Sequence, residues 1–479
     1  MPDLAARHGL WKRLLIGAIL IVVASASATA VAAFREIDKV VDVLAGHSEL
    51  DLGPGVLAEA DAGKPQTVML IGSDRRAKTA RDGGGGARSD TIILVRLDPS
   101  KKATALVSLP RDLLVTIPGH GRDKINAAYS IGGAKLTLAT VKEVTGLRIN
   151  HVINIDFRGF REAVNAIGCV YLDIDRRYYN DNTGGQQYAT IDVKQGYQKL
   201  CGQNALDYVR FRHEDNDLVR AARQQEFLRE AKQQIGVGEL IHDRDALVKI
   251  FGKYTRSDLR SRKSVLRLLK LVVASAGHPI AEVHFRGDVG PTYVKATPAE
   301  IRKSTREFLG VRASRGPRGR LKPKAARRGQ AKAAALGLED ASTAGREQAL
   351  QAIGAGARIP VYYPRIRTKQ ALFGGEPRVY AIRAPDGKVH SSYRMVIKKG
   401  LVGEYYGLQG TGWRNPPILS DPSETRRIRG RRYELFYDGD RLRLIAWRTP
   451  KGAYWVSNTL LQTLSERQML AIARSATTL

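Results

Sequence analysis

Aspartates and arginines recur in short segments of this chain, and together they indicate phosphate chemistry. Asp74 follows one apolar run, and Asp90 precedes the next. Arg111 comes at the end of a predicted strand, and Arg210 and Arg212 stand two residues apart. Carboxylates bind divalent cations, while arginines bind phosphate oxygens. If the fold brings these side chains into one pocket, the chemistry that they support is phosphoryl transfer.

Arg210 and Arg212 are expected on a strand, within the run Tyr208-Val209-Arg210-Phe211-Arg212. Side chains two residues apart on a strand point the same way, so the two guanidinium groups would form one cationic clamp. Two parallel guanidinium groups match the oxygens of a pyrophosphate. The alternative is a pair of surface arginines on an edge strand.

A helix is predicted shortly after Asp217, and its polar residues strengthen the case for a ligand. Arg220 and Gln224 lie one turn apart and share a face with Phe227 and Leu228. Polar groups that point into a core are costly unless they bind something. We therefore favour ligand contact over a structural ion pair for Arg220. Asp217 is either a pocket residue or simply the N-cap of this helix.

Asp74 and Asp90 are the candidate metal ligands. Open α/β sheets place ligand-binding groups at the ends of strands, and two carboxylates there would hold a Mg²⁺ ion that bridges phosphate oxygens. The alternatives are a turn-forming role for Asp74 and a strand-start cap for Asp90. Instead of binding phosphate, Arg111 could form an ordinary salt bridge with Asp112. Lys124 could equally be an ordinary loop lysine.

Strands and helices are expected to alternate in the first two thirds of the chain. Predicted strands cover 67–71, 91–97, 103–109, 113–117, 152–155, 170–174 and 281–285. Predicted helices cover 136–144, 160–167, 220–235, 243–251, 264–276 and 298–309. The alternation indicates an α/β domain with a buried sheet.

The N-terminal segment contains a candidate membrane anchor. Residues 14–34 are uncharged and long enough to cross a bilayer, and Arg7, Lys12 and Arg13 precede them. The prediction is a cytoplasmic tail at 1–13, a transmembrane signal-anchor at 14–34 and a stalk at 35–65. A cleaved signal peptide is the alternative, because A-x-A-like sites occur in the Ala-rich second half. Either way, the rest of the chain is expected outside the cytoplasm.

The composition indicates more than one domain and an anionic partner. The chain has 479 residues, a length that exceeds what one core usually organises. Hydrophobic residues make up 43% of it, which is enough to form real cores. A formal net charge of +31 and a pI near 10.2 imply a polyanionic neighbour. A location outside the cytoplasm argues against nucleic acid and leaves an anionic membrane face or a cell-wall polymer.

The only two cysteines are Cys169 and Cys201. An even pair in an exported domain predicts a disulfide bond, with two buried thiols as the alternative. The bond would tie the segment before the predicted Arg210/Arg212 strand to the neighbouring strand at 170–174.

The last third of the chain divides into a basic linker and a small module. Residues 311–357 are rich in Lys, Arg, Ala and Gly, so a disordered linker is predicted, which either contacts anionic polymer or is a solvated spacer. Residues 358–479 contain short β-like runs, a final helix and three of the four tryptophans. A small separate core of α+β type is expected there, without a catalytic group.

The ordered motifs resemble those of the LytR-CpsA-Psr family of cell-wall phosphotransferases. They are Gly72-Ser73-Asp74, Arg88-Ser89-Asp90-Thr91, Ser108-Leu109-Pro110-Arg111-Asp112, Asp123-Lys124-Ile125-Asn126-Ala127-Ala128-Tyr129, Ala205-Leu206-Asp207-Tyr208-Val209-Arg210-Phe211-Arg212 and the run from Asp217 to Gln224. The resemblance covers roughly residues 67–234 and fades through about residue 309. It implies a domain at 66–310 with a central mixed sheet flanked by helices, and an apolar tunnel for a prenyl chain.

The resemblance also implies a membrane-anchored enzyme that transfers a glycopolymer from a polyprenyl-pyrophosphate carrier to peptidoglycan through a phosphodiester link. Asp74 and Asp90 match its magnesium-binding aspartates. The positions that match pyrophosphate contacts are Arg88, Arg111, Arg210, Arg212 and Arg220, and those that match further pocket residues are Lys124, Asp217 and Gln224. The predicted catalytic group comprises Arg111, Arg210, Arg212 and Asp217. The glycine-rich segment Gly83 to Gly86 separates the two aspartates by more residues than the family pattern leads us to expect.

Two other functions remain compatible with these residues. A magnesium-dependent hydrolase would cleave polyprenyl pyrophosphate with the same clamp and without an acceptor. A non-enzymatic wall-polymer binding protein would instead depend on the basic linker and the aromatic module. Product analysis separates the first from a transferase, and deletion of the residues after Arg312 separates the second.

Overall fold

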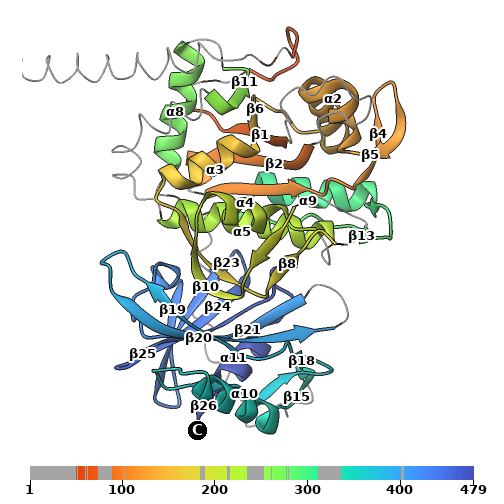
Figure 1. Cartoon of the computed structure of the whole chain (residues 1–479). Coiled ribbons are helices and arrows are strands. Elements are labelled where there is room, and N and C mark those ends of the chain that lie inside the picture. Colours follow the sequence, from red (N-terminus) through yellow and green to blue (C-terminus); the bar gives the residue numbers. More distant parts are fainter. Residues whose placement is uncertain are drawn as a thin grey trace, which may run out of the picture.

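The structure is a computed structural model, which describes residues 50, 52–59, 61, 63–73, 89–101, 103–183, 189–212, 216–234, 253–259, 262–276, 278, 280–310, 336–400 and 404–479. The predicted anchor at 14–34, the predicted helix at 243–251, Asp74 and Arg88 lie outside these residues. None of the helices described has both the length and the apolar character that a bilayer-spanning helix requires. Two sheets, each with its own helices, are stacked one above the other (Figure 1).

A six-stranded mixed sheet organises the first part of the chain. Its order is β11, β6, β1, β2, β3 and β12. The central strand β2 is antiparallel to both of its neighbours, β1 and β3, whereas β6 runs parallel to β1 and β12 runs parallel to β3. The bounds are β1 Gln66–Ser73, β2 Ser89–Asp98, β3 Ala103–Leu109, β6 His151–Asp156, β11 Thr255–Ser257 and β12 Ile280–Val283. The predicted α/β fold with a central mixed sheet is therefore confirmed.

Helices cover both faces of this sheet because the central strands are apolar on both sides. Met69 and Ile71 face one core, which Leu138 and Phe308 complete from α2 and α9. Val68 faces the opposite core, on the side of α8. The bounds of the helices in this part are α2 Ala127–Thr145, α3 Phe157–Ala166, α4 Gly202–Arg210, α5 Asp217–Gln234, α8 Arg262–Ala276 and α9 Pro298–Gly310.

Short two-stranded pieces surround the central sheet. The predicted strand at 113–117 is not a central strand, because β4 (Leu114–Ile117) pairs only with β5 (Gly121–Lys124) in a separate hairpin. The other pairs are β7 (Val170–Ile174) with β10 (Gly196–Leu200), β8 (Tyr178–Asn180) with β9 (Ile191–Val193), and β13 (Asp288–Val289) with β14 (Val294–Lys295).

The predicted disulfide between Cys169 and Cys201 is present. Val170 pairs with Leu200 in the β7–β10 ladder, so the two cysteines stand next to each other at the end of that ladder. The bond closes a loop of 32 residues directly before α4. It therefore fixes the start of the helix that ends at Arg210.

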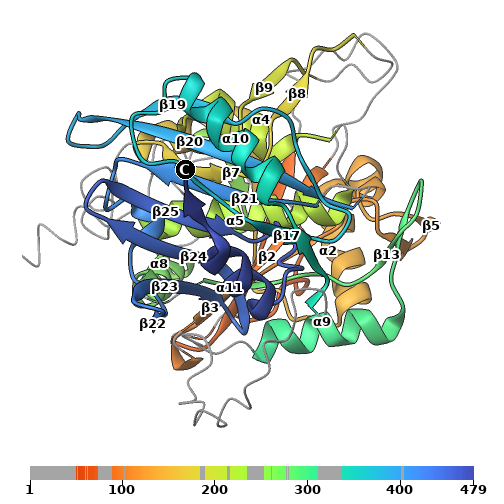
Figure 2. The same cartoon turned by 90° about the horizontal axis from the view of Figure 1, so that it is seen from below.

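The C-terminal domain, which we define as residues 336–400 and 404–479, is built on an eight-stranded sheet. Its strands are β18 Leu372–Phe373, β19 Arg378–Arg383, β20 Val389–Lys399, β21 Glu404–Thr411, β22 Glu424–Ile428, β23 Arg431–Asp438, β24 Arg441–Thr449 and β25 Gly452–Ser457. Helices α10 (Ser342–Gly354) and α11 (Glu466–Ser475) lie on the side turned away from the first sheet, and they are in front in the view from below (Figure 2). Four short strands complete the domain, namely β15 Leu338–Asp340, β16 Tyr362–Tyr363, β17 Ile366–Thr368 and β26 Thr477–Thr478.

The prediction of a disordered linker at 311–357 is wrong for its C-terminal part, which is folded. Residues 338–354 form β15 and α10, and Ala349 and Ala352 of α10 are fully buried in the core of the C-terminal domain. The small side chains that suggested disorder instead allow this helix to approach the sheet closely. The Lys- and Arg-rich part of the segment lies outside the described residues.

The core of the C-terminal domain is not fully separate from the first domain. Tyr171 on β7 and Tyr197 on β10 belong to one apolar cluster with Trp455 on β25. The Tyr197 and Trp455 rings meet edge to face with centroids 5.5 Å apart, and Tyr171 stacks on Tyr197 at 5.8 Å. One face of the second sheet is therefore covered by the first domain, which the composition did not reveal.

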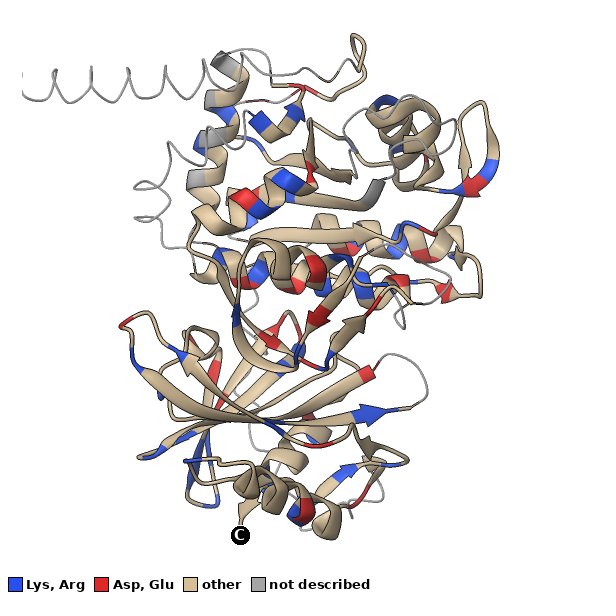
Figure 3. Cartoon of the chain, in the orientation of Figure 1, with Lys and Arg blue, Asp and Glu red and all other residues tan. Residues whose placement is uncertain are grey.

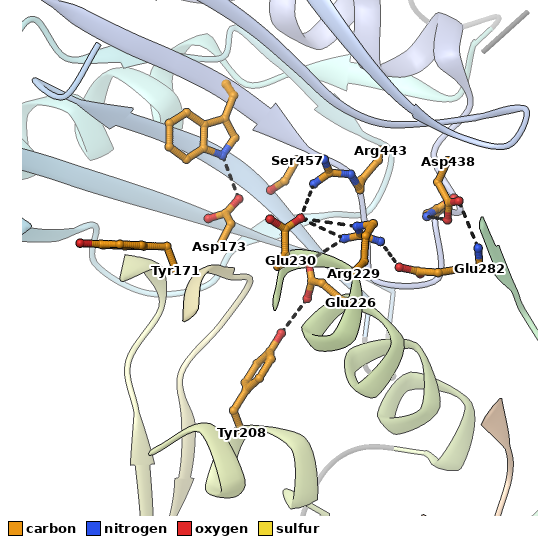
Figure 4. Close-up of polar contacts among 12 residues, drawn as sticks. Tyr171, Asp173, Tyr208, Glu226, Arg229, Glu230, Glu282, Asp438, Arg443 and Ser457 are labelled. Atoms are coloured by element: carbon orange, nitrogen blue, oxygen red, sulfur yellow. Dashed lines mark hydrogen bonds and ion pairs between the residues drawn. The ribbon is translucent and has the colours of Figure 1, made fainter. Parts of the chain in front are cut away.

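Buried ion pairs also cross this boundary, where acidic and basic segments face each other (Figure 3). Asp173 on β7 accepts hydrogen bonds from Arg394 Nη1 at 3.0 Å and from Trp455 Nε1 at 2.9 Å. Arg443 on β24 lies 3.1 Å from Glu230 on α5 (Figure 4). Such pairs contribute little net stability, but removal of one partner leaves a buried charge that costs several kcal/mol.

Glu226 on α5 makes the boundary sensitive to pH. Burial raises the pKa of Glu226 to about 7, although Arg229, 3.7 Å away, opposes that shift. The Tyr208 hydroxyl donates a hydrogen bond of 2.8 Å to the carboxylate. The folded protein therefore keeps a proton at this site in a pH range where the unfolded chain, with a pKa of 4.5, has released it.

We predict that the melting temperature of the full chain falls as the pH rises from about 5.5 to about 8.5. Because the raised pKa belongs to the folded state, the contribution of Glu226 is fully present below the unfolded pKa and is lost as the pH passes about 7. Glu226→Gln should flatten the profile, as measured by differential scanning fluorimetry. Glu347→Gln, at an exposed position of α10, is the control and should leave the profile unchanged. Equal profiles for the wild type and Glu226→Gln would contradict this assignment.

Candidate functional site

An apolar cavity of about 490 Å³ lies between the central sheet and helices α3, α5 and α8. The sheet contributes Val68, Leu70 and Leu106, and the helices contribute Phe160 and Phe227 among others. Protein interiors rarely leave a space of this size empty, and apolar cavities of several hundred Å³ are typical of ligand sites. The cavity is thus built to receive an apolar chain.

Lys232 is the charged residue among those that line the cavity. Its ammonium group donates to the backbone carbonyls of His278 at 2.6 Å and Ser275 at 3.2 Å, and to Thr104 Oγ1 at 3.2 Å. Burial lowers the pKa of Lys232 to about 8. Thr104 lies near the start of β3, whereas Ser108, near its end, lies beside the polar cluster described next.

Asp217 is the centre of a polar cluster at the first turn of α5. One carboxylate oxygen accepts a hydrogen bond from the Asp112 backbone amide at 2.8 Å. The other pairs with Arg220 and lies 3.8 Å from Arg111 Nε. Asp217 is not the N-cap, because Asn216 fills that role by accepting from the Val219 amide. The structure therefore brings together three predicted residues, Asp217, Arg111 and Arg220, and Asp217 holds the two arginines in place.

Lys124 extends this cluster from β5. Its Nζ lies 3.1 Å from Asp112 Oδ1, while Arg111 Nε lies 3.6 Å from the other oxygen of Asp112. The backbone of this loop is also fixed, because the Arg111 carbonyl accepts from the Asn126 amide at 3.2 Å. Lys124 and Arg111 thus share one carboxylate, which keeps two positive charges close together on the same side of the site.

The predicted strand for Arg210 and Arg212 is wrong. Residues 202–210 form α4, so Arg210 is the last residue of a helix and Arg212 follows it outside any helix or strand. The alternation of aromatic residues and arginines suggested a strand, but buried Ala205 and Tyr208 follow a helical spacing. Arg210 Nη2 lies 3.0 Å from Asp207 one turn earlier. The two arginines therefore do not project from one face of a strand.

Helix α5 nevertheless holds the backbone around Arg210 and Arg212. Gln224 Nε2 donates to the Val209 carbonyl at 3.2 Å and to Thr91 Oγ1 at 2.9 Å. Arg223 Nη2 donates to the Phe211 carbonyl at 2.7 Å. Gln224, predicted as a substrate contact, thus joins α5 to β2 and to the end of α4.

Arg223 is a residue of the site that the sequence reasoning missed. It is fully buried, and its guanidinium group lies 4.6 Å from the Tyr178 ring and 5.5 Å from the Tyr208 ring. The available signal was its place in the run Arg220-Ala221-Ala222-Arg223, since a residue three positions after Arg220 lies near the same helix face.

The strand ends next to the two predicted metal ligands are paired. Ser73, the last residue of β1, pairs with Ser89 of β2, whereas Gly72 pairs with Thr91. Asp90 is therefore the extra residue of a β-bulge, a feature that is common beside active sites. The glycine-rich segment does not separate these strand ends, because Ser73 and Ser89 are direct neighbours. Ser73 also donates to Asn154 at 2.8 Å, and Asn154 in turn donates to Tyr129 at 2.5 Å.

One other group of possible metal ligands occurs in the described part of the chain, at the boundary between the domains. It comprises Glu282, His284 and Asp438. Glu282 is already paired with Arg229, and Asp438 accepts from the Glu282 amide at 3.3 Å and from Gln462 at 3.0 Å. Burial lowers the pKa of His284 to about 4. These contacts account for the two carboxylates without an ion.

The cavity and the polar cluster are consecutive along α5. Asp217, Arg220 and Gln224 occupy its first half, and Phe227 and Leu228 line the cavity from the next turn. Phe227 lies seven residues after Arg220, which is roughly 10 Å along the helix, so the cavity and the arginine lie within the length of one extended amphiphile. This arrangement is that of an α/β protein with an apolar cavity and a cluster of arginines on the same helix, a combination that suits an amphiphile with an apolar chain and an anionic head group.

Comparison with known proteins agrees with that class. A model of the LytR_cpsA_psr family matches residues 24–294, more than half of the chain. This protein therefore belongs to the LytR_cpsA_psr family.

Relatives in that family have names that refer to the cell wall. The polyisoprenyl-teichoic acid–peptidoglycan teichoic acid transferase TagU of Oceanobacillus iheyensis is 28% identical over 317 residues, which cover 63% of this chain and 94% of TagU. The corresponding transferase TagT of Bacillus subtilis is 35% identical over 173 residues, 36% of this chain, so the chain spans about half (53%) of TagT. A probable cell wall biosynthesis protein, LcpB of Corynebacterium glutamicum, is 38% identical over 33% of this chain and 39% of its own length. A solved structure of TagT with bound octaprenyl pyrophosphate lipid is 26% identical, covers 55% of this chain and 100% of its own, and has a TM-score of 0.39.

We predict that Ala163→Phe, on the cavity side of α3, weakens binding of a fluorescent long-chain alkyl phosphate at least about tenfold, or roughly 1.4 kcal/mol. The added ring would occupy space that the apolar chain needs. Ala274→Phe is the matched control, because Ala274 is an exposed residue of α8 and does not line the cavity. Fluorescence titration of the folded variants measures the effect. Equal affinities for Ala163→Phe and the wild type would show that the apolar chain binds elsewhere.

Proposed function

We propose that this protein transfers a glycopolymer from a polyprenyl-pyrophosphate carrier to peptidoglycan and joins the two by a phosphodiester link. The observation that carries the proposal is that α5 carries both a wall of the apolar cavity, at Phe227 and Leu228, and the Asp217 cluster with Arg220 and Arg111, about two turns earlier. Membership of the LytR_cpsA_psr family and the names of the relatives TagU and TagT support it.

In this proposal the carrier lies along α5. The prenyl chain occupies the cavity beside Phe227 and Leu228, where it is removed from water. The pyrophosphate lies at the end with Arg111 and Arg220, whose guanidinium groups match its oxygens. Asp217 orients both arginines through its two oxygens. Arg210 and Arg212 follow at the end of α4, next to backbone that α5 holds.

The reaction that we propose is a displacement at phosphorus. An acceptor hydroxyl of peptidoglycan attacks the phosphorus atom that carries the glycopolymer, and the bond from that phosphorus to the bridging oxygen breaks. Polyprenyl phosphate leaves with the bridging oxygen, and the hydroxyl proton is released to a nearby base. The arginines stabilise the negative charge on the transferring phosphoryl group, which is the main contribution of protein in such reactions. Asp217 is one candidate for the base, although its contacts with Arg220 and the Asp112 amide compete with that role.

Magnesium fits the residue types at the ends of β1 and β2. Asp74 follows the last residue of β1, and Asp90 occupies the bulge of β2 opposite that end. Carboxylates suit Mg²⁺, which usually keeps several of its water ligands, and we propose that these two residues hold it. A bound Mg²⁺ ion would neutralise charge on the phosphate oxygens.

We also propose that residues 14–34 anchor the protein in the cell membrane with the described domains outside the cytoplasm. The uncharged run and the basic residues before it support this orientation. The disulfide between Cys169 and Cys201 is consistent with an oxidising compartment. Such a location puts the cavity next to the membrane that would supply a polyprenyl carrier.

We predict that Arg111→Met or Arg220→Met in the full chain lowers the rate of transfer at least about 100-fold. Each substitution removes a positive charge that would stabilise the negative charge developing on the transferring phosphoryl group. The assay contains detergent-solubilised protein, a polyprenyl-pyrophosphate oligosaccharide, a peptidoglycan fragment and Mg²⁺, and mass spectrometry identifies the products. Arg122→Met, at an exposed position of β5, is the control and should transfer normally. Chelation of the metal should abolish transfer and restored Mg²⁺ should recover it.

The products decide between the proposed functions. A phosphodiester-linked conjugate that depends on Arg111 supports the transferase. Release of polyprenyl phosphate without a conjugate would favour the hydrolase. Binding of wall polymer with neither product, lost on deletion of residues after Arg312, would favour the non-enzymatic alternative.

A further inference from the structure

We propose that the C-terminal domain positions the arginines of the active site, through Tyr405 and Arg443. This inference rests on the proposed function, because it assigns those arginines to the pyrophosphate. Its basis is that two separate contacts lead from the second sheet to the segments that hold Arg210, Arg212 and Arg220. The C-terminal domain would then be part of the catalytic unit and not a separate polymer-binding module.

The first contact is an aromatic stack at the start of β21. The Tyr405 ring lies 5.1 Å from the guanidinium carbon of Arg176, which precedes β8 in the first domain. The same guanidinium carbon lies 4.6 Å from the Tyr178 ring and 5.4 Å from the Phe211 ring. Phe211 stands between Arg210 and Arg212 in the chain, and its side chain is buried. Tyr405 therefore reaches the arginine segment through a single intervening side chain.

Arg223 on α5 is a second buried arginine that contacts Phe211. Its guanidinium group lies 4.6 Å from the Tyr178 ring and 5.8 Å from the Phe211 ring, and it donates to the Phe211 carbonyl at 2.7 Å. Phe211 thus contacts two buried cations, Arg176 and Arg223. Cation–π contacts are stronger when water is excluded, so loss of the Tyr405 ring would weaken a desolvated stack.

The second contact is ionic and acts on α5 directly. Arg443 on β24 lies 3.1 Å from Glu230, whose side chain is 1% exposed. Arg229, the preceding residue of α5, lies 3.4 Å from Glu230 and is also paired with Glu282 (Figure 4). The same helix carries Arg220 and Gln224 two to three turns earlier. A shift of α5 at Glu230 would therefore be transmitted along a rigid helix to Arg220.

The geometry of the boundary makes such a shift consequential. The Arg394 side chain is completely buried against Asp173, and Trp455 donates to the same carboxylate, so the two domains are fixed to each other. Removal of Arg443 would leave the Glu230 carboxylate with one arginine fewer in a dry site, which favours a rearrangement of α5. Displacements near 1 Å at reacting groups are enough to lower rates strongly. Positioning therefore explains why a boundary remote from the phosphate site holds so many charges.

The test uses the full chain with Tyr405→Leu and Arg443→Met. We expect kcat for transfer to fall about tenfold in each variant, while KM for the carrier changes less than about twofold because the cavity is intact. Tyr405→Phe keeps the ring and should restore the rate, whereas Arg443→Lys keeps the charge without the fork and should restore it in part. Arg367→Met is the matched control, because Arg367 pairs with Glu339 at 2.9 Å entirely within the C-terminal domain.

Hydrogen exchange provides a readout that does not depend on activity. Backbone amides of residues 208–212 and 216–224 should exchange faster in Tyr405→Leu and Arg443→Met than in Arg367→Met. If the wild type transfers no glycopolymer but hydrogen exchange in Tyr405→Leu and Arg443→Met changes as expected, the proposed function is wrong and the positioning role is supported. If both variants match Arg367→Met in exchange and in kcat, the positioning role is overturned. Should Arg443→Met unfold globally, the same comparison is made with Arg443→Lys.

Discussion

Burial of charge along α5 is the constraint on which the rest of this structure depends. Asp217, Arg220, Arg223, Arg229 and Glu230 are all buried in one helix of 18 residues. Charges removed from water must be paired, and the partners of these residues come from every side of the helix. Arg111 and the Asp112 amide contact Asp217 in the first turn. The Phe211 carbonyl accepts a hydrogen bond from Arg223 in the middle of the helix, and Arg443 pairs with Glu230 in its second half. The helix thus fixes the phosphate site, the wall of the cavity and the boundary between the domains together.

The same helix explains the division between its apolar and polar neighbours. Phe227 and Leu228 face the cavity, while Arg229 and Glu230 face the second domain. The apolar cavity and the C-terminal domain therefore lie on different sides of one helix. Rigid secondary structure holds a site more accurately than a loop does. For the proposed transferase, this means that lipid binding and domain docking both act on the groups that contact phosphate.

Local patterns predicted much of the first domain, because its strands are continuous apolar runs and its helices end at clear signals such as Gly146. Residue type and spacing left open whether Asp217 is an N-cap and whether Arg111 pairs with Asp112, and it was the family resemblance that implied one pocket for Asp217, Arg111 and Arg220. The assignment of Arg210 and Arg212 to a strand failed, because five residues of alternating pattern outweighed the helical spacing that starts at Ala205. The prediction of a disordered linker was wrong for residues 338–354, because Ala and Gly are common in closely packed helices as well as in disordered segments. The contacts of Arg443 and Tyr405 with the first domain could not be predicted, because contacts between distant segments leave no periodic pattern in the sequence.

The boundary between the domains also sets the order in which the chain can fold. The disulfide joins residues 32 apart, whereas the bond from Trp455 to Asp173 joins residues 282 apart. Closure of long loops costs more entropy, so contacts of this range form late. A chain that emerges N-terminus first therefore completes its first sheet with Tyr171 and Tyr197 still exposed to solvent. Those two rings would lose their exposure to water only when β25 packs on them, and a chain that ended before Trp455 would keep an uncovered apolar face.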